Sequence, residues 1–228
     1  MSTIAVAIDG PSGAGKSTIA RAAAKRLGYL YVDTGAMYRT IGLAACRAGI
    51  AVGETERVSP ILAGLHIELA YDDEGVQHVV LNGEDVSAAI RTPEMSEYAS
   101  FVSKIPEVRA YLLDTQRNLA KTHSVIMDGR DIGTVILPNA QVKIFLTASA
   151  EARAERRYQE YLDKGQQVTL DEVLEQMLHR DKQDTERAAA PLRQAEDAVR
   201  VDTSRMTLEQ SIQAVLDQIQ RKAMEERI

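Results

Sequence analysis

The feature that most constrains this chain is a glycine-rich segment near its start. It fits the pattern G-x-x-x-x-G-K-[ST] at every fixed position and reads Gly10-Pro11-Ser12-Gly13-Ala14-Gly15-Lys16-Ser17. An apolar run at 4–8 precedes it and predicts a buried strand, and residues 19–27, which end at Gly28, predict a helix. This order aims backbone N–H groups and a helix N-terminus at phosphate oxygens. The flanks argue against a chance glycine turn, so we predict a nucleoside triphosphate site in which Lys16 reaches the β- and γ-phosphates and Ser17 ligates Mg²⁺.

Composition narrows the class of protein and of partner. With 228 residues, 45% hydrophobic and 26% charged, the chain suits one globular domain with an ample core. Its net charge of −6 provides no general basic field for nucleic acid or a membrane surface. We therefore expect small-molecule substrates, no nucleic acid, no membrane and a monomer. An anionic substrate has to be held by local arginine clusters.

Cysteine usage and the chain start point to the compartment. Cys46 is the only cysteine, which excludes an internal disulfide and a cysteine zinc cluster and favours a small buried residue in a helix. No apolar run approaches a membrane span, and the chain opens on a strand rather than on a signal peptide pattern. We expect a cytoplasmic protein.

Strand-like and helix-like segments alternate along the chain. Helical patterns separate and follow the strand-like runs, and a capping box at Thr207 and Gln210 opens the last helix, with an apolar stripe at Ile212, Val215, Leu216 and Ile219. This alternation predicts a single α/β domain over 1–228, with a parallel five-stranded sheet flanked by helices and the ligand at the carboxyl ends of the strands. The expected strands are 4–8, 29–32, 125–127, 142–146 and 198–202.

An antiparallel unit interrupts this alternation. Residues 66–71 and 76–81 flank the turn residues 72–75, and the tight-turn pair Asn82-Gly83 follows. We predict a β insert over about 66–86, inside a substrate-binding subdomain at 34–105 that also holds a loop and short helix at 51–65.

Two groups of polar residues follow predicted strands. Thr34 and Arg39 come after the second strand and can hydrogen-bond a second phosphate, although an N-cap with a solvated arginine explains them equally well. Asp128-Gly129-Arg130-Asp131 ends the third strand, where an acidic residue of a P-loop protein often orients Mg²⁺ or its water shell. A turn with a surface ion pair is the alternative for this second group.

Two further groups lie on predicted helices. Arg153, Arg156 and Arg157 share one face of a helix over about 149–163, and the spacing of Arg180, Asp184 and Arg187 puts them on one face if the helix at 170–187 continues that far. A solvated, salt-bridged surface explains either set taken alone. No [NT]-K-x-D motif is present, so guanine recognition is unsupported. The arginines suit transfer between two phosphate-bearing substrates, which depends on positioning and charge neutralisation rather than on a dedicated base.

Taken together, these motifs resemble those of the bacterial cytidylate kinases, a branch of the nucleoside monophosphate kinase family. The resemblance runs nearly the full length and includes the insert. It implies ATP-dependent phosphorylation of CMP and dCMP, with Mg²⁺ as cofactor. The motifs that carry it are the loop at 10–17, Asp-Thr-Gly-Ala-Met-Tyr-Arg at 33–39, Arg91-Thr92, Ser100, Pro106-x-Val108-Arg109, Asp-Gly-Arg-Asp-Ile-Gly-Thr at 128–134, and Arg180-Asp181-x-x-Asp184-x-x-Arg187.

The resemblance also implies a role for each site residue. Ser100, Arg109 and Asp131 would recognise the cytosine edge. The sugar would be bound by Arg180 and Asp184. The CMP phosphate falls to Thr34, Arg39, Arg130 and Arg187. A lid at 150–165 covers ATP with Arg153 and Arg157, which join Lys16 and Arg130 as catalytic residues, while Ser17 and Asp128 hold the metal, Asp128 through water. The ATP-binding residues are Gly10, Pro11, Ser12, Gly13, Ala14, Gly15, Lys16, Ser17 and Thr18.

Two alternatives stay open on the sequence. One is another small-molecule P-loop kinase, acting on UMP, AMP or a non-nucleotide acceptor; the insert and the set Ser100, Arg109 and Asp131 argue against it. The other is a switch that binds a nucleotide without transferring a phosphoryl group. The missing guanine-recognition residues and the arginine-rich second site argue against it.

Overall fold

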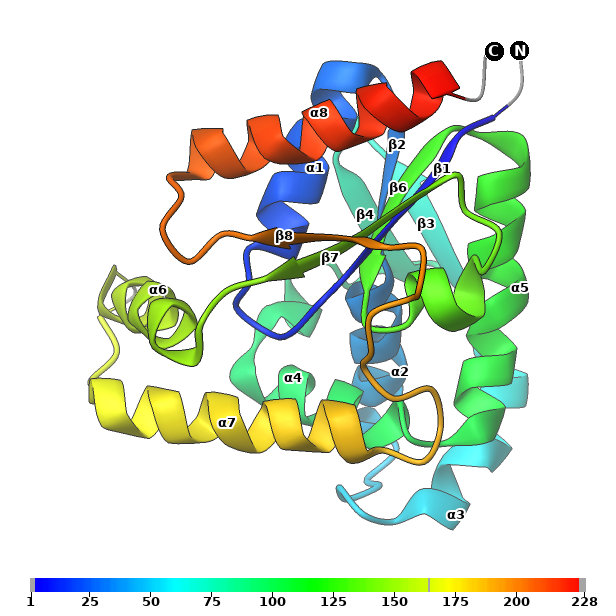
Figure 1. Cartoon of the computed structure of the whole chain (residues 1–228). Helices are drawn as coiled ribbons and strands as arrows, with labels where there is room; N and C mark the ends of the chain where they lie inside the picture. Colours follow the sequence, from blue (N-terminus) through cyan, green and yellow to red (C-terminus); the bar gives the residue numbers. More distant parts are fainter. Residues whose placement is uncertain (1–2, 164, 226–228) are drawn as a thin grey trace.

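A parallel five-stranded sheet forms the centre of the molecule. The computed structural model describes residues 3–163 and 165–225. Within them the strand order is β2-β6-β1-β7-β8, every neighbouring pair is parallel, and Figure 1 shows helices on both faces. The predicted sheet is confirmed. Its strands are β1 (Ala5–Asp9), β2 (Leu30–Asp33), β6 (Val125–Gly129), β7 (Val142–Thr147) and β8 (Val199–Asp202).

One face of the sheet is covered by helices α1 (Lys16–Leu27) and α8 (Leu208–Glu225). Gly28 ends α1 in a left-handed conformation, and its N–H donates to the carbonyl of Ala24. Thr207 and Gln210 exchange the two hydrogen bonds of the predicted capping box before α8. The predicted apolar stripe is buried against the sheet, as expected for an amphipathic helix: Ile212, Val215, Leu216 and Ile219.

The other face carries α5 (Pro106–Thr122) and η3, a short π-helix over Ile132–Ile136. Residues of β1 alternate between the two layers, because Val6 and Ile8 join the core under α1 while Ala7 packs on the opposite side. The π-helix follows Asp131 directly and was not predicted. It brings the segment after β6 back beneath the end of β1.

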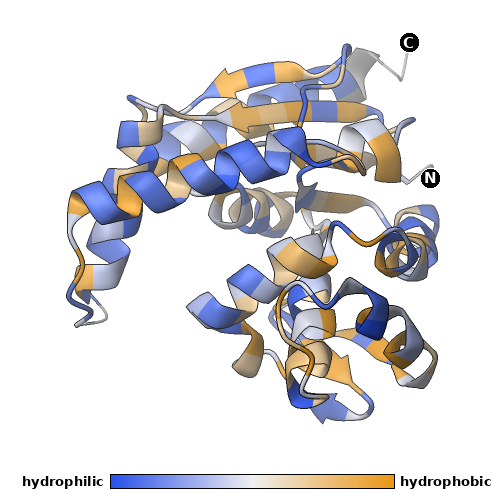
Figure 2. Ribbon diagram, turned by 90° about the horizontal axis from the view of Figure 1, so that it is seen from below, coloured by the Kyte–Doolittle hydropathy of each residue, from blue (hydrophilic) through white to orange (hydrophobic). Residues whose placement is uncertain are grey.

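The predicted insert lies to one side of the main sheet (Figure 2). Its strands β3 (Ile67–Tyr71) and β4 (Gln77–Leu81) form the expected hairpin, and Asn82-Gly83 turns the chain with two positive φ angles into a third strand, β5 (Glu84–Asp85), that was not predicted. The remaining elements of this part are α2 (Thr34–Arg47), α3 (Thr55–Val58), η1 (Ser59–Gly64), η2 (Ala89–Arg91) and α4 (Pro93–Val102).

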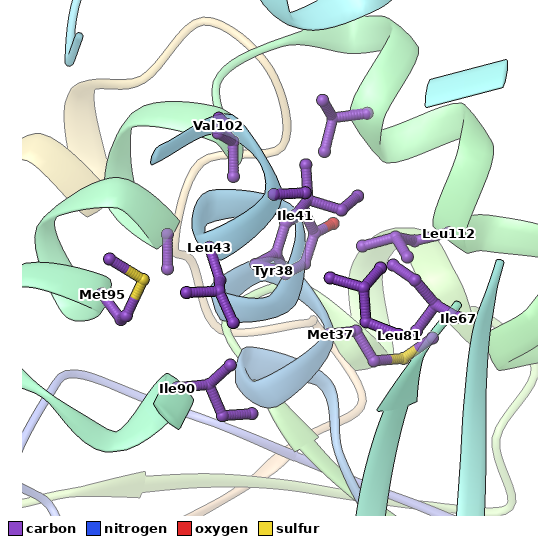
Figure 3. Packing of buried hydrophobic residues seen from close by; sticks show 14 of the residues in the cluster. Met37, Tyr38, Ile41, Leu43, Ile67, Leu81, Ile90, Met95, Val102 and Leu112 are labelled. Carbon is purple, nitrogen blue, oxygen red and sulfur yellow. The ribbon is translucent and has the colours of Figure 1, made fainter. Parts of the chain in front are cut away.

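Helix α2 joins the insert to the sheet and is the centre of a second hydrophobic core. Met37, Tyr38 and Ile41 of α2 pack among side chains from the hairpin and from α4 and α5 (Figure 3). Helix α2 begins directly after β2, so this packing fixes the insert to the carboxyl edge of the sheet, where ligands of such folds bind.

Two helices over the loop at 10–17 complete the fold: α6 (Ala150–Asp163) and α7 (Leu170–Glu186). They pack on each other through a small cluster of Ala154, Val173 and Met177. Helix α7 ends at Glu186, so Arg187 lies just beyond it in extended backbone. This corrects the expectation that Arg187 shares a helix face with Arg180 and Asp184. Among the described residues, no helix is long and apolar enough to cross a membrane.

Candidate active site

The glycine loop leaves the end of β1 at the centre of the sheet and curls over Lys16. Gly10 has a φ of 149°, and a Cβ there would lie 1.9 Å from the backbone oxygen of Leu146, so only glycine fits. Gly15 has a φ of 87° directly before α1. Lys16 as a residue is 5% exposed, and its ammonium donates to the carbonyl of Pro11 across 2.7 Å. The loop therefore has the shape that cradles phosphate oxygens.

The electrostatics around Lys16 favour an anion. Burial and the guanidinium of Arg130 together lower the pKa of Lys16 to about 7, although the carboxylates of Asp128, Asp184 and Asp9 oppose the shift. A buried ammonium whose proton is held this weakly is stabilised by added negative charge. Phosphate groups in the loop supply that charge.

Asp128 ends β6 beside the loop, and both of its carboxylate oxygens accept hydrogen bonds. Ser17 Oγ donates to Oδ2 across 2.8 Å, and the hydroxyl of Tyr31 donates to Oδ1 across 2.9 Å. Burial, together with the nearby carboxylate of Asp33, raises the pKa of Asp128 to about 6. A cation beside Asp128 would relieve both effects.

The oxygen donors present fit a magnesium ion. Ser17 and Asp128 offer a hydroxyl and a carboxylate side by side. In the described part of the chain, no cluster of three or more acidic, histidine or cysteine side chains forms a metal cage. Mg²⁺ is usually held by one or two protein oxygens, with substrate phosphates and water completing its octahedron. The pair is therefore sufficient for a metal that arrives with a nucleotide.

Helix α2 begins with a cap and an ion pair that orient Arg39. Asp33 accepts a hydrogen bond from the N–H of Ala36 across 2.9 Å, and its other oxygen pairs with Arg39 Nη2 at 2.9 Å. Thr34 Oγ1 donates to the backbone oxygen of Asp128 across 2.7 Å. The capping explanation is thus correct for Asp33, but Arg39 is not a freely solvated arginine, because it pairs with Asp33 and only 21% of its side chain is exposed. Its Nε is buried and has no hydrogen-bond partner among the described residues.

A basic cluster forms where α7 meets the end of β6. We call Arg39, Arg130, Arg157 and Arg180 the arginine cluster. Arg130 Nε pairs with Asp184 Oδ2 at 2.7 Å, and this carboxylate raises the pKa of Arg130 although burial opposes the charge. Burial and the other three arginines of the cluster together lower the pKa of Arg180 to about 10, although Asp184 opposes the shift. Arg180 Nε is also buried, with no partner in the part of the chain that the structure describes.

A second ionic group lies at the start of η3. Asp131 is 3% exposed and pairs with Arg109, and its other oxygen accepts from Arg187 Nη2 at 3.3 Å. The Arg109 guanidinium lies 5.8 Å from the centre of the Tyr38 ring. Burial raises the pKa of Tyr38 to about 12 and lowers that of Arg187. The burial of Asp131 excludes the surface turn considered from the sequence.

Ser100 joins this group indirectly. Its hydroxyl donates to Gln183 Oε1 of α7 across 3.1 Å, and its backbone oxygen accepts from the Ser103 hydroxyl, which lies 3.5 Å from Arg187 Nη1. The structure thus brings together Arg109, Asp131 and Arg187 directly, and Ser100 by way of Ser103. Helices α4 and α7 meet at this place, because Arg180 also donates to the carbonyl of Ser96 at 3.1 Å.

The three arginines of α6 have different surroundings. Arg153 is 4% exposed; it donates to the carbonyls of Ala148 and Ser12, both at 3.0 Å, and pairs with Asp181 at 2.6 Å. Arg156 donates to Thr203 after β8. Within the described residues, Arg157 forms an ion pair only with Glu160 of its own helix, at 3.0 Å, and 37% of its side chain is exposed. Arg153 therefore links α6 and α7 to the phosphate loop, while Arg157 is open to a ligand.

Three side chains near the site are not among the site residues predicted from the sequence. Tyr31 holds Asp128, Gln77 of the insert accepts from the N–H of Asp33 at 2.8 Å, and Asp9 accepts from two backbone N–H groups of η3. Only Asp9 carried a signal, since it is an acidic residue at the end of an apolar strand and directly before the loop. The other two depend on contacts between distant segments.

Comparison with known proteins gives a consistent result over nearly the whole chain. A family model described as cytidylate kinase matches residues 6–221. A cytidylate kinase of Caldicellulosiruptor saccharolyticus is 50% identical over 95% of this chain and 96% of its own length. One of Carboxydothermus hydrogenoformans is 48% identical, over 95% and 97%.

Likeness to solved structures concerns the fold alone. A gluconokinase from Sinorhizobium meliloti 1021 has a TM-score of 0.50 and 16% identity, over 99% of this chain and 96% of that one. The sheet and its flanking helices are thus an arrangement found in distantly related kinases.

Proposed function

The chain belongs to the cytidylate kinase family, and from this membership we propose how its residues transfer a phosphoryl group to CMP. The protein is an enzyme, a nucleoside monophosphate kinase. In the reaction, a phosphate oxygen of CMP bonds to the γ-phosphorus of ATP while the bond to the β–γ bridging oxygen breaks, which gives CDP and ADP. With dCMP the product is dCDP. Every residue of the proposal lies in one chain, so we propose that the monomer is active.

The donor phosphates occupy the loop at 10–18. Backbone N–H groups and the start of α1 bind them, and Lys16 releases the carbonyl of Pro11 to reach the β- and γ-oxygens. Arg157 turns towards the transferring phosphoryl group, which its exposure and its place in the arginine cluster support. Arg153, whose donors bind the protein itself, holds the lid helices on the loop.

The acceptor phosphate is held by Thr34, Arg39, Arg130 and Arg187. The buried Nε of Arg39, which has no partner among the described residues, supports an anionic ligand there. Arg180 and Asp184 bind the sugar hydroxyls, supported by the unpaired Nε of Arg180. No general base is required, because the phosphate is already ionised at neutral pH and the enzyme acts by positioning it and neutralising its charge.

Asp131, Arg109 and Ser100 read the base. The cytosine N4 amino group donates to the Asp131 carboxylate, and N3 and O2 accept from Arg109. Uracil presents O4 to the same carboxylate, so two acceptors face each other in a buried place. Such a mismatch in a polar recognition site costs several orders of magnitude in kcat/KM.

Ser17 and Asp128 would hold the magnesium ion, Asp128 through a water molecule. A bound ion would neutralise negative charge on the transferring phosphate groups. The hydrogen bond between the two side chains already orients both of them for this task.

The observation that carries the proposal is the buried set of like charges beside the glycine loop. Arg130 lowers the pKa of both Lys16 and Arg180, and two guanidinium nitrogens there lack partners within the described residues. Two phosphate-bearing substrates would supply the missing negative charge and the missing acceptors.

A panel of acceptors tests the function. ATP and Mg²⁺ are incubated with CMP, dCMP, UMP, AMP or no acceptor, and ADP and the nucleoside diphosphate are both measured. We expect equal amounts of ADP and CDP or dCDP, and little product with UMP or AMP. ADP formation that is independent of the acceptor would indicate an ATPase or switch, and no turnover with CMP and dCMP would refute the proposal.

A further inference from the structure

Asp9 is a buried carboxylate that the phosphoryl-transfer chemistry does not use. It is the last residue of β1, directly before Gly10, and is 5% exposed. Both of its oxygens accept backbone hydrogen bonds of 2.7 Å, Oδ1 from Ile132 and Oδ2 from Gly133. Burial raises the pKa of Asp9 to about 6 although the two hydrogen bonds oppose the shift. Burying a charged carboxylate costs free energy unless the group is hydrogen-bonded, and here both oxygens are.

The two N–H groups belong to the first turn of η3. A helical turn leaves its first N–H groups without partners inside the helix, and Asp9 satisfies two of them. Asp131 immediately precedes this turn, and its own backbone oxygen accepts from the N–H groups of Val135 and Ile136. Both polar groups of the peptide bond between Asp131 and Ile132 are therefore held. Asp9 at the end of β1 binds its N–H, and the π-helix itself binds its carbonyl.

This contact joins the two substrate sites of the enzyme. Asp9 is covalently continuous with the loop that holds ATP, and the backbone that it holds carries the side chain that pairs with Arg109 and Arg187. In the register of the sheet Asp9 lies beside Gly129 of β6 and Phe145 of β7, at its centre. A displacement of η3 against β1 would thus move the Asp131 carboxylate relative to the glycine loop.

We propose that Asp9 is a positioning residue for base selection, which fixes the Asp131 carboxylate against the phosphate loop through the N–H groups of Ile132 and Gly133. The inference rests on the proposed reading of cytosine by Asp131. Asp9 touches neither substrate. Its effect is to set where Asp131 stands when the acceptor base arrives.

The substitution Asp9→Asn tests this with almost no change of shape. An amide has one accepting oxygen, so one of the two N–H groups faces an NH₂ donor in either orientation of the side chain. We expect η3 to shift and kcat/KM for CMP to fall between about 5- and 100-fold. Asp9 contributes least among the three carboxylates that raise the pKa of Lys16, so we expect the KM for ATP to change less than kcat/KM for CMP. The preference for CMP over UMP falls by a larger factor than the KM for ATP rises.

A double-mutant cycle distinguishes positioning from general damage. If Asp9 acts through Asp131, adding Asp9→Asn to Asp131→Ala causes little further loss of CMP over UMP preference. Asp72→Asn is the control for the change of charge alone, because Asp72 accepts from the N–H groups of Glu74 and Val76 with the single oxygen Oδ1, which an amide retains, in the exposed hairpin turn. We expect it to behave as wild type.

Each outcome decides the inference. Equal losses for CMP and ATP, full additivity with Asp131→Ala, or a wild-type phenotype of Asp9→Asn would overturn it. If Asp131→Ala changes selectivity but Asp9→Asn does not, the inference alone fails; if Asp131→Ala has no effect on selectivity, the proposed base recognition fails as well. Should Asp9→Asn not fold, Asp9→Glu tests the same contact, since it keeps the charge and both accepting oxygens but displaces them by one methylene from the N–H groups of Ile132 and Gly133. The same CMP-specific loss is then expected, and unchanged selectivity would refute the inference.

Discussion

The hydroxyl of Ser17 donates a 2.8 Å hydrogen bond to Asp128 Oδ2, which joins the first turn of α1 to the end of β6. The bond crosses from the loop proposed for the donor phosphates to the strand that leads into Arg130 and Asp131 of the proposed acceptor site. Tyr31 holds the other oxygen of the same carboxylate. The carboxylate of the proposed metal-binding pair is thus oriented from both sides.

Asp128→Asn separates the charge of this carboxylate from its shape. The amide oxygen still accepts a hydrogen bond, but the negative charge that attracts Mg²⁺ is gone. We expect the Mg²⁺ concentration for half-maximal activity to rise by about 10- to 100-fold. Activity measured against Mg²⁺ at saturating ATP and CMP checks this.

Thermal unfolding without ligands serves as the control, because loss of a buried charge should not reduce stability. An unchanged Mg²⁺ requirement would remove Asp128 from the metal site.

Lys16→Ala removes the side chain that reaches the transferring phosphoryl group. We expect kcat to fall by about 10²- to 10³-fold, because an electrostatic contact made in the transition state is lost. The fold should be intact, since Lys16 bonds only the carbonyl of Pro11 among the described residues. Near-normal kcat in a steady-state assay would contradict the phosphate role.

The affinity for ATP should depend on pH through the same lysine. In the free enzyme the pKa of Lys16 is about 7, and the negative charge of bound ATP raises it. Above pH 7 the free lysine has lost its proton and must regain it on binding, so the Kd for ATP rises by up to about tenfold per pH unit. The Kd should be measured between about pH 7.5 and 9. Asp128, whose pKa is about 6, stays ionised throughout that range and does not contribute to the dependence.

Lys16→Arg is the control for this dependence, because arginine stays charged throughout that range. The variant should bind ATP with a nearly flat pH profile. A flat profile for the wild type, or the same slope in both proteins, would contradict the low pKa of Lys16 in the free enzyme.

Arg153 and Arg157 should differ in what their loss does. Arg153→Ala leaves Asp181 and two carbonyls without their donor, so we expect the free energy of unfolding to fall by about 2 to 4 kcal/mol. Arg157→Ala breaks only an exposed pair and should cost less than about 1 kcal/mol, yet reduce kcat more than tenfold. Urea unfolding and steady-state kinetics of both variants measure the contrast.

The reverse pattern would exchange the two assignments. A stable Arg153→Ala with low kcat would make Arg153 the lid arginine that contacts the transferring phosphate. Equal kcat in Arg157→Ala and wild type would remove Arg157 from catalysis.

Most of the sheet could be predicted because its signals are local. The apolar runs mark the strands within one or two residues, and the glycine loop between β1 and α1 needs only its own sequence to be recognised. The hairpin at Ile67–Leu81 was equally visible, because the turn residues 72–75 separate two strand-like runs, and Gly75 there has a φ of 75°. Strand β5 was missed since two residues carry no periodicity.

The site could be predicted as a set of residues but not as an arrangement. Its groups come from one strand, six helices and the loops between them, and only the fold shows that Arg109 meets Asp131 or that Arg153 is buried against Ser12. The π-helix after Asp131 has no sequence period of its own, so the role of Asp9 could not be seen. Arg187 lies outside α7 because the helix ends one residue earlier, a boundary that propensity does not fix.

The central claim is that Asp131 makes this kinase select cytosine, and the ratio of kcat/KM for CMP to that for UMP, in wild type and in Asp131→Ala, tests it most directly. We predict a wild-type ratio of at least about 10² that falls towards one in the variant, since the carboxylate that accepts from the N4 amino group is lost, while the KM for ATP stays nearly constant. An unchanged ratio, or equal losses in the use of CMP and of ATP, would contradict the account.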